Sequence, residues 1–410
     1  MKFDTLVLGA GMVGVSIAAH LQQRGLSVAL IDRKAPGNET SFGNAGLIQR
    51  EGVYPYAFPR GLGTLLGYAG NRALDVRYHP GAMFKLAPFL WRYWRNSAPD
   101  RHIAIARAYS TLIEHCVSEH KALAASAGAA DMLRPTGWIR VFRTAAKFDE
   151  ELKTAERWQR EYGIEYDVLD AAALHAAEPD LSSALIGGVR YGQSYSVADP
   201  NALVTAYARY FERLGGRIVF GDASTLEPHW RVSTEEGVLE ASSAVVALGP
   251  WSAPLCAKLG YRLSLGIKRG YHMHYRPKSG ARLNHPVLDA EKGYLLAPMA
   301  RGIRLTTGAE LALLDEPKTP DQLEAVEPIA RDLFPLGERV DSEPWMGQRP
   351  CTSDMLPVIG PATRHPGLWF AFGHAHHGLT LGPVTGRLIA DMVTGAKPFV
   401  DPRPFRIDRF

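Results

Sequence analysis

The sequence predicts an α/β fold in which a Rossmann-like domain is interleaved with a second domain built on a mixed, mostly antiparallel sheet. The first reason is a βαβ start, with a buried strand over Thr5–Leu8, a helix over Gly14–Arg24 and a second strand over Ser27–Ile31. The second reason is that strand, glycine turn and helix return in the same order over 368–393. The third is a β-rich stretch over 264–342.

Each domain is expected to be assembled from separated pieces, because the α/β pattern stands at both ends of the chain. We expect 1–78, 185–263 and 343–410 to form the Rossmann-like domain, and 79–184 with 264–342 to form the second domain. Local patterns predict an irregular region over 42–82, helices over 84–95, 102–127, Lys147–Tyr162 and Asn201–Leu214, strands over Trp138–Arg143, Arg217–Phe220 and Ser243–Leu248, and antiparallel strands over Lys268–Tyr275, Gly293–Pro298 and Ile303–Ala309.

Composition excludes several classes of protein. At about 150 residues per domain, 410 residues correspond to two or three domains. Hydrophobic residues make up 46% and charged residues 21%, which is typical of a chain with buried cores and not of a disordered one. The formal net charge of +4 suits an anionic ligand or a membrane surface but is too small to indicate nucleic-acid binding.

The cysteines and the N-terminal segment indicate where the protein works. Cys116, Cys256 and Cys351 show no C-x-x-C spacing, so they predict neither a disulfide framework nor a zinc site. The apolar segment 5–19 follows Asp4 and is shorter than a membrane span of about 20 residues, so we expect neither a signal peptide nor a membrane span. A cytoplasmic protein with at most peripheral contact to the inner face of the cell membrane is the simplest interpretation.

A glycine-rich turn stands between the first strand and the first helix. Gly9, Gly11 and Gly14 form a G-x-G-x-x-G pattern. Gly9 permits the tight turn, Gly11 lets the backbone approach a pyrophosphate, and Gly14 allows close packing of helix on strand. The pyrophosphate would lie at the helix N-terminus beside Met12 and Val13, where free N–H groups favour negative charge.

Asp32 ends the second strand, where a carboxylate accepts hydrogen bonds from ribose hydroxyls. The turn and this acid predict a dinucleotide, but they do not choose between FAD and NAD. A second strand with a glycine over 245–251 and a third glycine cluster near the C-terminal end favour FAD. An NAD dehydrogenase usually places its catalytic groups in a separate, contiguous domain.

Three segments carry a resemblance to a known family. They are 40–47 (Thr-Ser-Phe-Gly-Asn-Ala-Gly-Leu), 345–350 (Trp-Met-Gly-Gln-Arg-Pro) followed by Asp354, and Gly373-His374 before a glycine-rich helix start. With the first turn, they resemble the D-amino-acid oxidase superfamily of flavoproteins, and more narrowly bacterial D-amino-acid dehydrogenases.

The resemblance and the turn together predict contacts to the cofactor. Segment 41–47 would lie against the isoalloxazine, and the helix after Gly378 would direct its N-terminal dipole at the flavin edge that is negatively charged when reduced. The predicted cofactor contacts outside the first turn are Asp32, Arg33, Ser41, Asn44, Ala45, Gly46, Leu47, Ser224, Ala247, Gly249, Trp251, Gly373, His374, Gly378, Leu379 and Thr380.

Four further residues are substrate-site candidates. A guanidinium suits bidentate capture of a carboxylate, and the resemblance gives Arg349 this role; an ion pair with Asp354 is the alternative. Tyr294 matches a family tyrosine on a pocket strand and would add a hydroxyl, unless it is a core residue. Tyr271 and His376 are weaker candidates for the same pocket.

Two other chemistries are not expected. His374, His376 and His377 stand in an H-x-H-H run that converges poorly and lacks a supporting cysteine or carboxylate cluster, so we predict no metal. His272 and His274 alternate on a strand without a third ligand, and they are expected to be core or surface residues. Cys351 does not match the position of covalent flavin attachment, so we expect a buried thiol and non-covalent FAD.

The resemblance implies oxidative deamination of a small D-amino acid or cyclic imino acid. A hydride would pass from Cα to flavin N5, and the electrons would then pass to a quinone or carrier. Departures from the family pattern at Gly43 and in 375–377 leave the amine open, with D-proline, cis-4-hydroxy-D-proline and N-alkyl glycines included. Alternatives are a glycine or sarcosine oxidase that uses oxygen, a flavin-binding subunit of an electron-transfer assembly, and an NAD-dependent dehydrogenase.

Segment 83–101 mixes aromatic and basic residues at roughly helical spacing. It contains Phe84, Trp91 and Trp94 beside Lys85 and Arg92. One interpretation is an interfacial helix on an anionic membrane. The other is an amphipathic helix that covers the protein's own core, and the sequence leaves both open.

Overall fold

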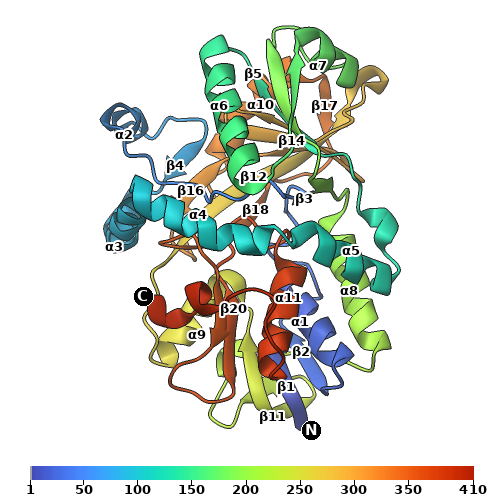
Figure 1. Ribbon diagram of the computed structural model, residues 1–410, viewed down its shortest axis with the longest axis vertical. Coiled ribbons are helices and arrows are strands. Elements are labelled where there is room, and N and C mark those ends of the chain that lie inside the picture. The colour runs from blue at the N-terminus through green and yellow to red at the C-terminus, as the bar shows by residue number, and fades with distance from the viewer. Residues whose placement is uncertain (1) are drawn as a thin grey trace.

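The computed structural model describes residues 2–410 and arranges them around two large sheets, one toward each end of the molecule (Figure 1). The sheet near the N-terminus is mostly parallel. Its strands are β1 (Lys2–Leu8), β2 (Val28–Asp32), β9 (Arg217–Phe220), β10 (Arg231–Thr234), β11 (Gly237–Val246), β19 (Val358–Pro361) and β20 (Leu368–Phe372). The order is β19-β20-β11-β1-β2-β9, with β10 and β19 as the antiparallel additions. Three separated pieces of the chain therefore form this sheet.

The βαβ start is confirmed. β1 is flanked in parallel by β2 and β11, and it leads through the glycine turn into α1 (Met12–Gln23). Leu6, Val7 and Leu8 are fully buried. Each buried aliphatic side chain of this size contributes about 1.5–3 kcal/mol, so the strand is fixed by its core.

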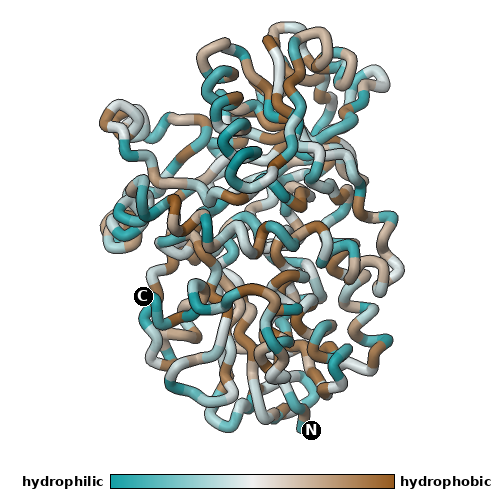
Figure 2. The backbone as a smooth tube through the Cα atoms, in the orientation of Figure 1, coloured by the Kyte–Doolittle hydropathy of each residue, from teal (hydrophilic) through white to brown (hydrophobic). Residues whose placement is uncertain are grey.

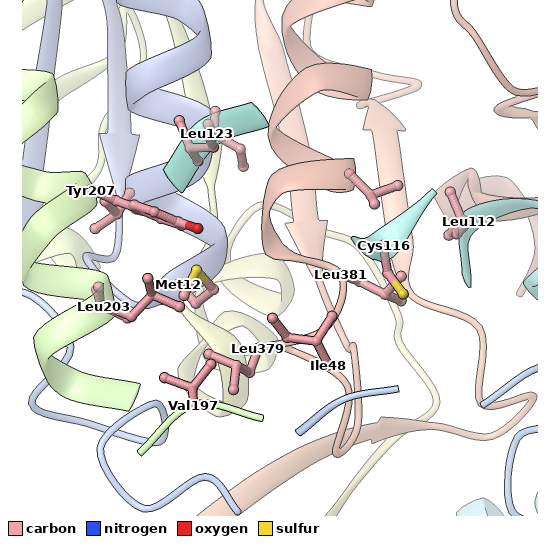
Figure 3. Packing of buried hydrophobic residues seen from close by; sticks show 14 of the residues in the cluster. Met12, Ile48, Leu112, Cys116, Leu123, Val197, Leu203, Tyr207, Leu379 and Leu381 are labelled. Carbon is pink, nitrogen blue, oxygen red and sulfur yellow. The ribbon is translucent and has the colours of Figure 1, made fainter. Parts of the chain in front are cut away.

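Helices cover this sheet. They are α1, α8 (Pro200–Arg213), α9 (Ser252–Lys258) and α11 (Gly382–Val393). Asp199 caps α8 by accepting a hydrogen bond from the Ala202 amide at 3.0 Å, and Pro200 stands in its first turn, so the helix begins within one residue of the predicted Asn201. In Figure 3, Met12 lies beside Leu203 and Tyr207 in one buried cluster.

The second sheet is mixed and mostly antiparallel. Its strands are β4 (Val76–Tyr78), β5 (Trp138–Phe142), β6 (Asp167–Asp170), β7 (Gly187–Tyr191), β12 (Leu265–Pro277), β13 (Val287–Asp289), β14 (Tyr294–Met299), β15 (Gly302–Thr306), β16 (Ala309–Ala312), β17 (Leu336–Arg339) and β18 (Trp345–Thr352). The order is β4-β16-β12-β15-β14-β13-β5-β7-β6, and β12 also pairs with β17 and β18. The predicted antiparallel pairing of β12, β14 and β15 is confirmed.

Sheet membership differs from the predicted division at three strands. β4, β7 and β18 lie in the second sheet, although the sequence division placed 76–78, 187–191 and 345–352 with the Rossmann-like domain. β18 pairs with β12 along eight residues. The strand that carries Arg349 therefore belongs to the second sheet and faces the first domain from above.

The remaining helices surround the second sheet and the waist of the molecule. They are α2 (Leu62–Ala69), α3 (Pro80–Asn96), α4 (Pro99–Ile113), α5 (Cys116–Ala127), α6 (Ala145–Tyr162), α7 (Ala171–Ala177) and α10 (Asp321–Leu333), and β3 (Leu47–Ile48) pairs with β8 (Tyr195–Ser196). Segment 42–82 is therefore not wholly irregular. The helix predicted over 102–127 is broken after Ile113, because α5 turns to pack against α8 and α11.

Hydropathy follows this layering. In Figure 2, α6 is mostly teal, whereas brown segments concentrate in the interior strands. None of the helices in the described part of the chain is long and apolar enough to cross a bilayer.

Candidate active site

A cavity of about 1130 Å³ lies where the two sheets face each other. It is lined by the glycine turn and the strand ends of the first sheet, and by β12 and β18 of the second. Small-molecule pockets usually measure roughly 300–1,000 Å³. This cavity therefore has room for a dinucleotide and a second, smaller molecule.

The glycine turn lines one end of the cavity. Gly9 has a φ of +108°, and a Cβ at this position would lie 2.5 Å from the Ala247 carbonyl oxygen. A Cβ on Gly14 would lie 1.8 Å from the Gly9 carbonyl oxygen. Glycine is therefore required at both positions. Gly9, Gly11, Met12 and Val13 line the cavity, whereas Gly14 lies beneath the turn.

Asp32 faces the same end. Its Oδ2 accepts a hydrogen bond from the Ala10 amide at 2.6 Å, and its Oδ1 accepts one from the Lys34 amide at 3.1 Å. These bonds orient the carboxylate while lone pairs remain for a ligand. The Arg33 guanidinium lies 4.2 Å above the Trp251 ring. Five predicted residues line the cavity here: Arg33, Ser224, Ala247, Gly249 and Trp251.

Segment 41–47 lies along the middle of the cavity. Ser41, Asn44, Ala45 and Leu47 line it, and the Ser41 hydroxyl accepts a hydrogen bond from the Met12 amide at 3.0 Å. Gly46 does not line the cavity, because it faces Val197, whose carbonyl oxygen would be 2.2 Å from a Cβ. The segment is thus held against α1 through Ser41 and packed against Val197 through Gly46.

Gly43, a departure from the resembled family's pattern, has a local explanation. A Cβ on Gly43 would lie 1.8 Å from a carbon of the Trp345 ring. Trp345 stands on β18 and also lines the cavity. The Trp345 ring therefore occupies the space that an alanine at position 43 would need.

The last glycine cluster lines the cavity ahead of α11. Gly373, His374, Gly378 and Leu379 line it. Thr380 does not; its hydroxyl donates to the Leu47 carbonyl at 3.1 Å and so joins this turn to the middle segment. A helix N-terminus thus approaches the cavity, where it favours negative charge.

Arg349 enters the cavity from β18. Its Nη1 donates to the Gly308 carbonyl at 2.7 Å, and its guanidinium lies over Gly270, where a Cβ would be 2.2 Å from Nη2. Burial lowers its pKa. Within residues 2–410, Arg349 forms no ion pair, and Asp354, its predicted alternative partner, pairs with Arg409 at 2.8 Å.

The comparisons with known proteins agree with this geometry. The model of the family described as FAD dependent oxidoreductase matches residues 4–392. The chain belongs to this family. It is 31% identical to a D-amino-acid oxidase of Bradyrhizobium diazoefficiens, over 98% of each chain, and 31% identical to a D-amino acid dehydrogenase of Granulibacter bethesdensis, over 99% of each.

Solved structures show the same fold. A glycine oxidase from Geobacillus kaustophilus superposes with a TM-score of 0.74 at 24% identity, covering 100% of this chain and 99% of the other. An L-proline dehydrogenase from P. horikoshii gives 0.76 at 18% identity, covering 100% and 98%. The predicted fold class is therefore confirmed for this FAD-dependent oxidoreductase.

FAD is the cofactor, and the described residues fit it. Gly9 and Gly11 line the cavity without a side chain, which leaves room for a pyrophosphate, and Asp32 presents carboxylate lone pairs at the same end. Segment 41–47 and the turn at 373–379 line the rest of the long cavity. The prediction of FAD rather than NAD is confirmed; its non-covalent attachment stays a prediction, and Cys351 is a buried free thiol.

The two tyrosine assignments need correction. Tyr294 points away from the cavity into the core, and its hydroxyl donates to the Ile329 carbonyl at 3.4 Å. Side chains alternate along β14, and it is Leu295 that lines the cavity. Tyr271 borders the cavity, but its hydroxyl donates to the Glu310 carboxylate at 2.8 Å and accepts from the Thr319 amide at 2.8 Å. Neither hydroxyl is free for a substrate carboxylate.

His376 lies in the cavity, as predicted. Its ring centroid is 4.8 Å from that of Tyr56 and 3.8 Å from that of His377. Burial, followed by the neighbouring His377 and then by the charges of Arg349 and Lys268, lowers the pKa of His376 well below its usual value. A neutral imidazole therefore lines the same cavity as Arg349. In the described part of the chain, no group of three or more His, Cys, Asp or Glu side chains is placed to hold a metal ion.

Lys268 is a cavity residue that the sequence reasoning missed. It stands on β12 directly opposite Arg349 on β18. Its Nζ donates to the Tyr93 hydroxyl at 2.8 Å. Alternation along β12 places Lys268 on the same face as Gly270, but only the register with β18 shows that this face meets the cavity.

Buried histidines make the fold sensitive to acid. Burial lowers the pKa of His120 to about 4, and the His120 ring bonds the Leu379 carbonyl at 2.8 Å beside the cavity. An unfolded histidine titrates near 6.5, so between these values the unfolded state binds the proton and stability falls as the pH drops. Each such histidine should cost about 2 kcal/mol at pH 5 relative to pH 8.

We therefore expect the melting temperature to fall as the pH is lowered from 8 to 5. The melting temperature of His120→Gln should fall less steeply than that of the parent. The exposed His175 provides the matched control in His175→Gln. Equal slopes for all three proteins would contradict the assignment. Thermal melts of the flavin-loaded proteins from pH 8 to pH 5 measure these slopes of melting temperature against pH.

Proposed function

We propose that this enzyme oxidises the Cα–N bond of a small D-amino acid or cyclic imino acid and passes the electrons to a quinone or carrier. Curated relatives at about 30% identity over the full chain length are named D-amino acid dehydrogenases, which supports this choice. When bound, FAD accepts the hydride from the substrate carbon. The product imino acid then takes up water to give a 2-oxo acid and an amine.

The observation that carries the proposal is Arg349. A guanidinium has five N–H donors, and the contacts to Gly308 and Thr307 use two of them. The remaining donors face a cavity in which this cation has no carboxylate partner among the described residues. A buried cation without a counter-ion is costly, so an anionic ligand group is its natural partner.

The other residues at this end position the substrate. With the carboxylate held by Arg349, the substrate amine lies within a pocket that includes the neutral imidazole of His376 and the ring of Tyr56. A neutral ring adds no positive charge beside the amine, so a neutral, reactive amine is favoured. Most of the rate enhancement then comes from positioning.

An anaerobic panel of amines tests the proposal. We expect bleaching of the flavin absorbance by D-amino acids or cyclic imino acids, and none by their L-enantiomers. The proposal would be contradicted if L-amino acids reduced the flavin, or if none of the amines did. Because Arg349 would bind the carboxylate of either enantiomer, amines that lack a carboxylate should not reduce the flavin, whichever enantiomer is the substrate.

An oxygen-using amine oxidase is the second candidate. A curated relative is named D-amino-acid oxidase, and a solved structure of the same fold is a glycine oxidase. Peroxide formation in air at the rate of substrate oxidation would support it. Rapid turnover with a quinone dye under argon, with slow reaction in air, would support the dehydrogenase.

A peripheral membrane contact would suit a quinone acceptor. α3 buries Leu86, Phe89 and Tyr93 on the protein's own core, but Phe84 is 89% exposed and Trp91 59% exposed. On α2, Leu62 and Leu66 are exposed, and Leu65 of the same helix lines the cavity. We propose that this surface, with the nearby Lys85, Arg92 and Arg95, rests on the anionic inner face of the cell membrane.

Phe84→Glu should weaken binding to anionic vesicles roughly tenfold or more, because burying a phenylalanine contributes about 1.5–3 kcal/mol. Val168 is also exposed but lies on β6, away from α3, so Val168→Glu is the matched control. Vesicle co-sedimentation measures both. Equal binding by parent and Phe84→Glu, or no binding by the parent, would contradict the contact.

A further inference from the structure

Two cations stand side by side at the substrate end of the cavity. Lys268 and Arg349 face each other across the antiparallel pair of β12 and β18 and both line the cavity. Their heads diverge. The Arg349 guanidinium leans over Gly270 toward the Gly308 carbonyl, whereas the Lys268 ammonium reaches the Tyr93 hydroxyl on α3.

Both heads keep unused donors. The Lys268 ammonium has three N–H groups, and its bond to Tyr93 at 2.8 Å uses one of them. Tyr93 in turn donates to the Tyr56 carbonyl at 2.5 Å, so its hydroxyl oxygen is fixed and the ammonium is held in place. Two ammonium donors and three guanidinium donors therefore lack a partner among the described residues.

No acid of the cavity wall neutralises this pair. Across residues 2–410, neither cation forms an ion pair with a carboxylate. The acidic residues of the wall are engaged elsewhere: Asp32 with the Ala10 amide, Glu39 with Arg33 and Lys34, Asp75 with the Tyr68 hydroxyl, Asp222 with the Ser224 amide, and Glu291 with the Arg143 and Thr144 amides. His376, the third basic group here, is neutral and supplies no negative charge.

We propose that the substrate carries a second anionic group and is a D-amino dicarboxylic acid. Arg349 holds the α-carboxylate, and Lys268 holds the distal carboxylate. This inference rests on the proposed amine oxidation and narrows it. The distal carboxylate does not react; the bonds changed are those of the α-carbon and its amine.

One carboxylate does not account for both cations. Arg349 alone satisfies an α-carboxylate with two parallel N–H bonds. Lys268 is then left as an unneutralised charge inside a cavity lined by Phe58, Leu90 and Met355, which is costly. A second carboxylate removes that cost, and its attraction to the ammonium adds to the specificity of the site.

The first experiment uses the flavin-loaded parent enzyme and pairs of near-isosteric substrates. We compare D-glutamate with D-glutamine and D-aspartate with D-asparagine, by anaerobic flavin reduction. Because charge-assisted hydrogen bonds contribute more than neutral ones, we expect the acid of the better pair to be preferred by on the order of 10- to 100-fold in kcat/KM. Equal rates for acid and amide, or preference for the amide, would overturn the inference.

The second experiment removes the proposed contact. Lys268→Gln should lower kcat/KM for the preferred dicarboxylate on the order of 100-fold, mainly through KM, and leave the value for its amide within about threefold. Lys268→Arg keeps the charge and should retain the preference. Lys278→Gln removes an exposed lysine just beyond the end of β12 and should change neither value.

The outcomes separate this inference from the proposed function. Should Lys268→Gln slow the acid and the amide equally, the lysine does not read a second carboxylate, and the inference fails. Reduction by neutral D-amino acids in that case would still support amine oxidation. Should no amine reduce the parent flavin, the proposed function itself fails. The parent comparison decides the question even if Lys268→Gln does not fold.

Discussion

Arg349→Ala is expected to lower kcat/KM for the substrate by roughly 30- to 4,000-fold, equivalent to about 2–5 kcal/mol. The guanidinium is positioned by the Gly308 carbonyl at 2.7 Å and has no carboxylate partner among the described residues. Removing it leaves the substrate carboxylate buried in the cavity without its counter-ion. The loss should affect every carboxylate-bearing substrate, whatever its side chain.

Two further variants make this result specific. Arg349→Lys keeps a positive charge but loses the planar fork, so it should recover only part of the rate. Arg262→Ala removes an exposed arginine just ahead of β12 and should match the parent. Flavin content, measured by absorbance, should stay unchanged in all three proteins. If Arg349→Ala retains parent kcat/KM with full flavin content, Arg349 does not bind the carboxylate.

The cofactor half of the site could be predicted because its signals are local. The turn from Gly9 to Gly14 needs glycine for reasons that lie within a few residues, apart from the approach of Ala247. The role of Asp32 could be predicted because this residue ends β2, next to the glycine turn. The predicted residues Gly14, Gly46 and Thr380 do not line the cavity, but Thr380 still joins two segments that do.

The proposed substrate half was harder to predict because its geometry is set by pairing between distant strands. β14 is apolar along most of its length, so nothing local shows which of its faces meets the cavity, and the resemblance assigned Tyr294 to the wrong face. Lys268 and Arg349 are 81 residues apart and become neighbours only through the register of β12 with β18. The same non-local pairing moved β4, β7 and β18 into the second sheet.

Gly14→Ala is expected to abolish retention of FAD. The added Cβ would lie 1.8 Å from the Gly9 carbonyl oxygen, which is backbone and part of the turn that receives the pyrophosphate. Overpacking of a well-packed core costs about 1–3 kcal/mol, and a clash with backbone belongs at or above the upper end. Relief requires that α1 move away from β1, which displaces the amides at its N-terminus.

The measurement is the flavin-to-protein absorbance ratio after purification, with the melting temperature recorded with and without added FAD. We expect less than about a tenth of the parent flavin content and a clear loss of the stabilisation that bound FAD provides. Gly192→Ala adds a Cβ where no atom lies within 4 Å, so this control should keep the parent values. Parent flavin content in Gly14→Ala would mean that the turn tolerates a displaced α1. The close contact of helix on strand would then not be what fixes the pyrophosphate site.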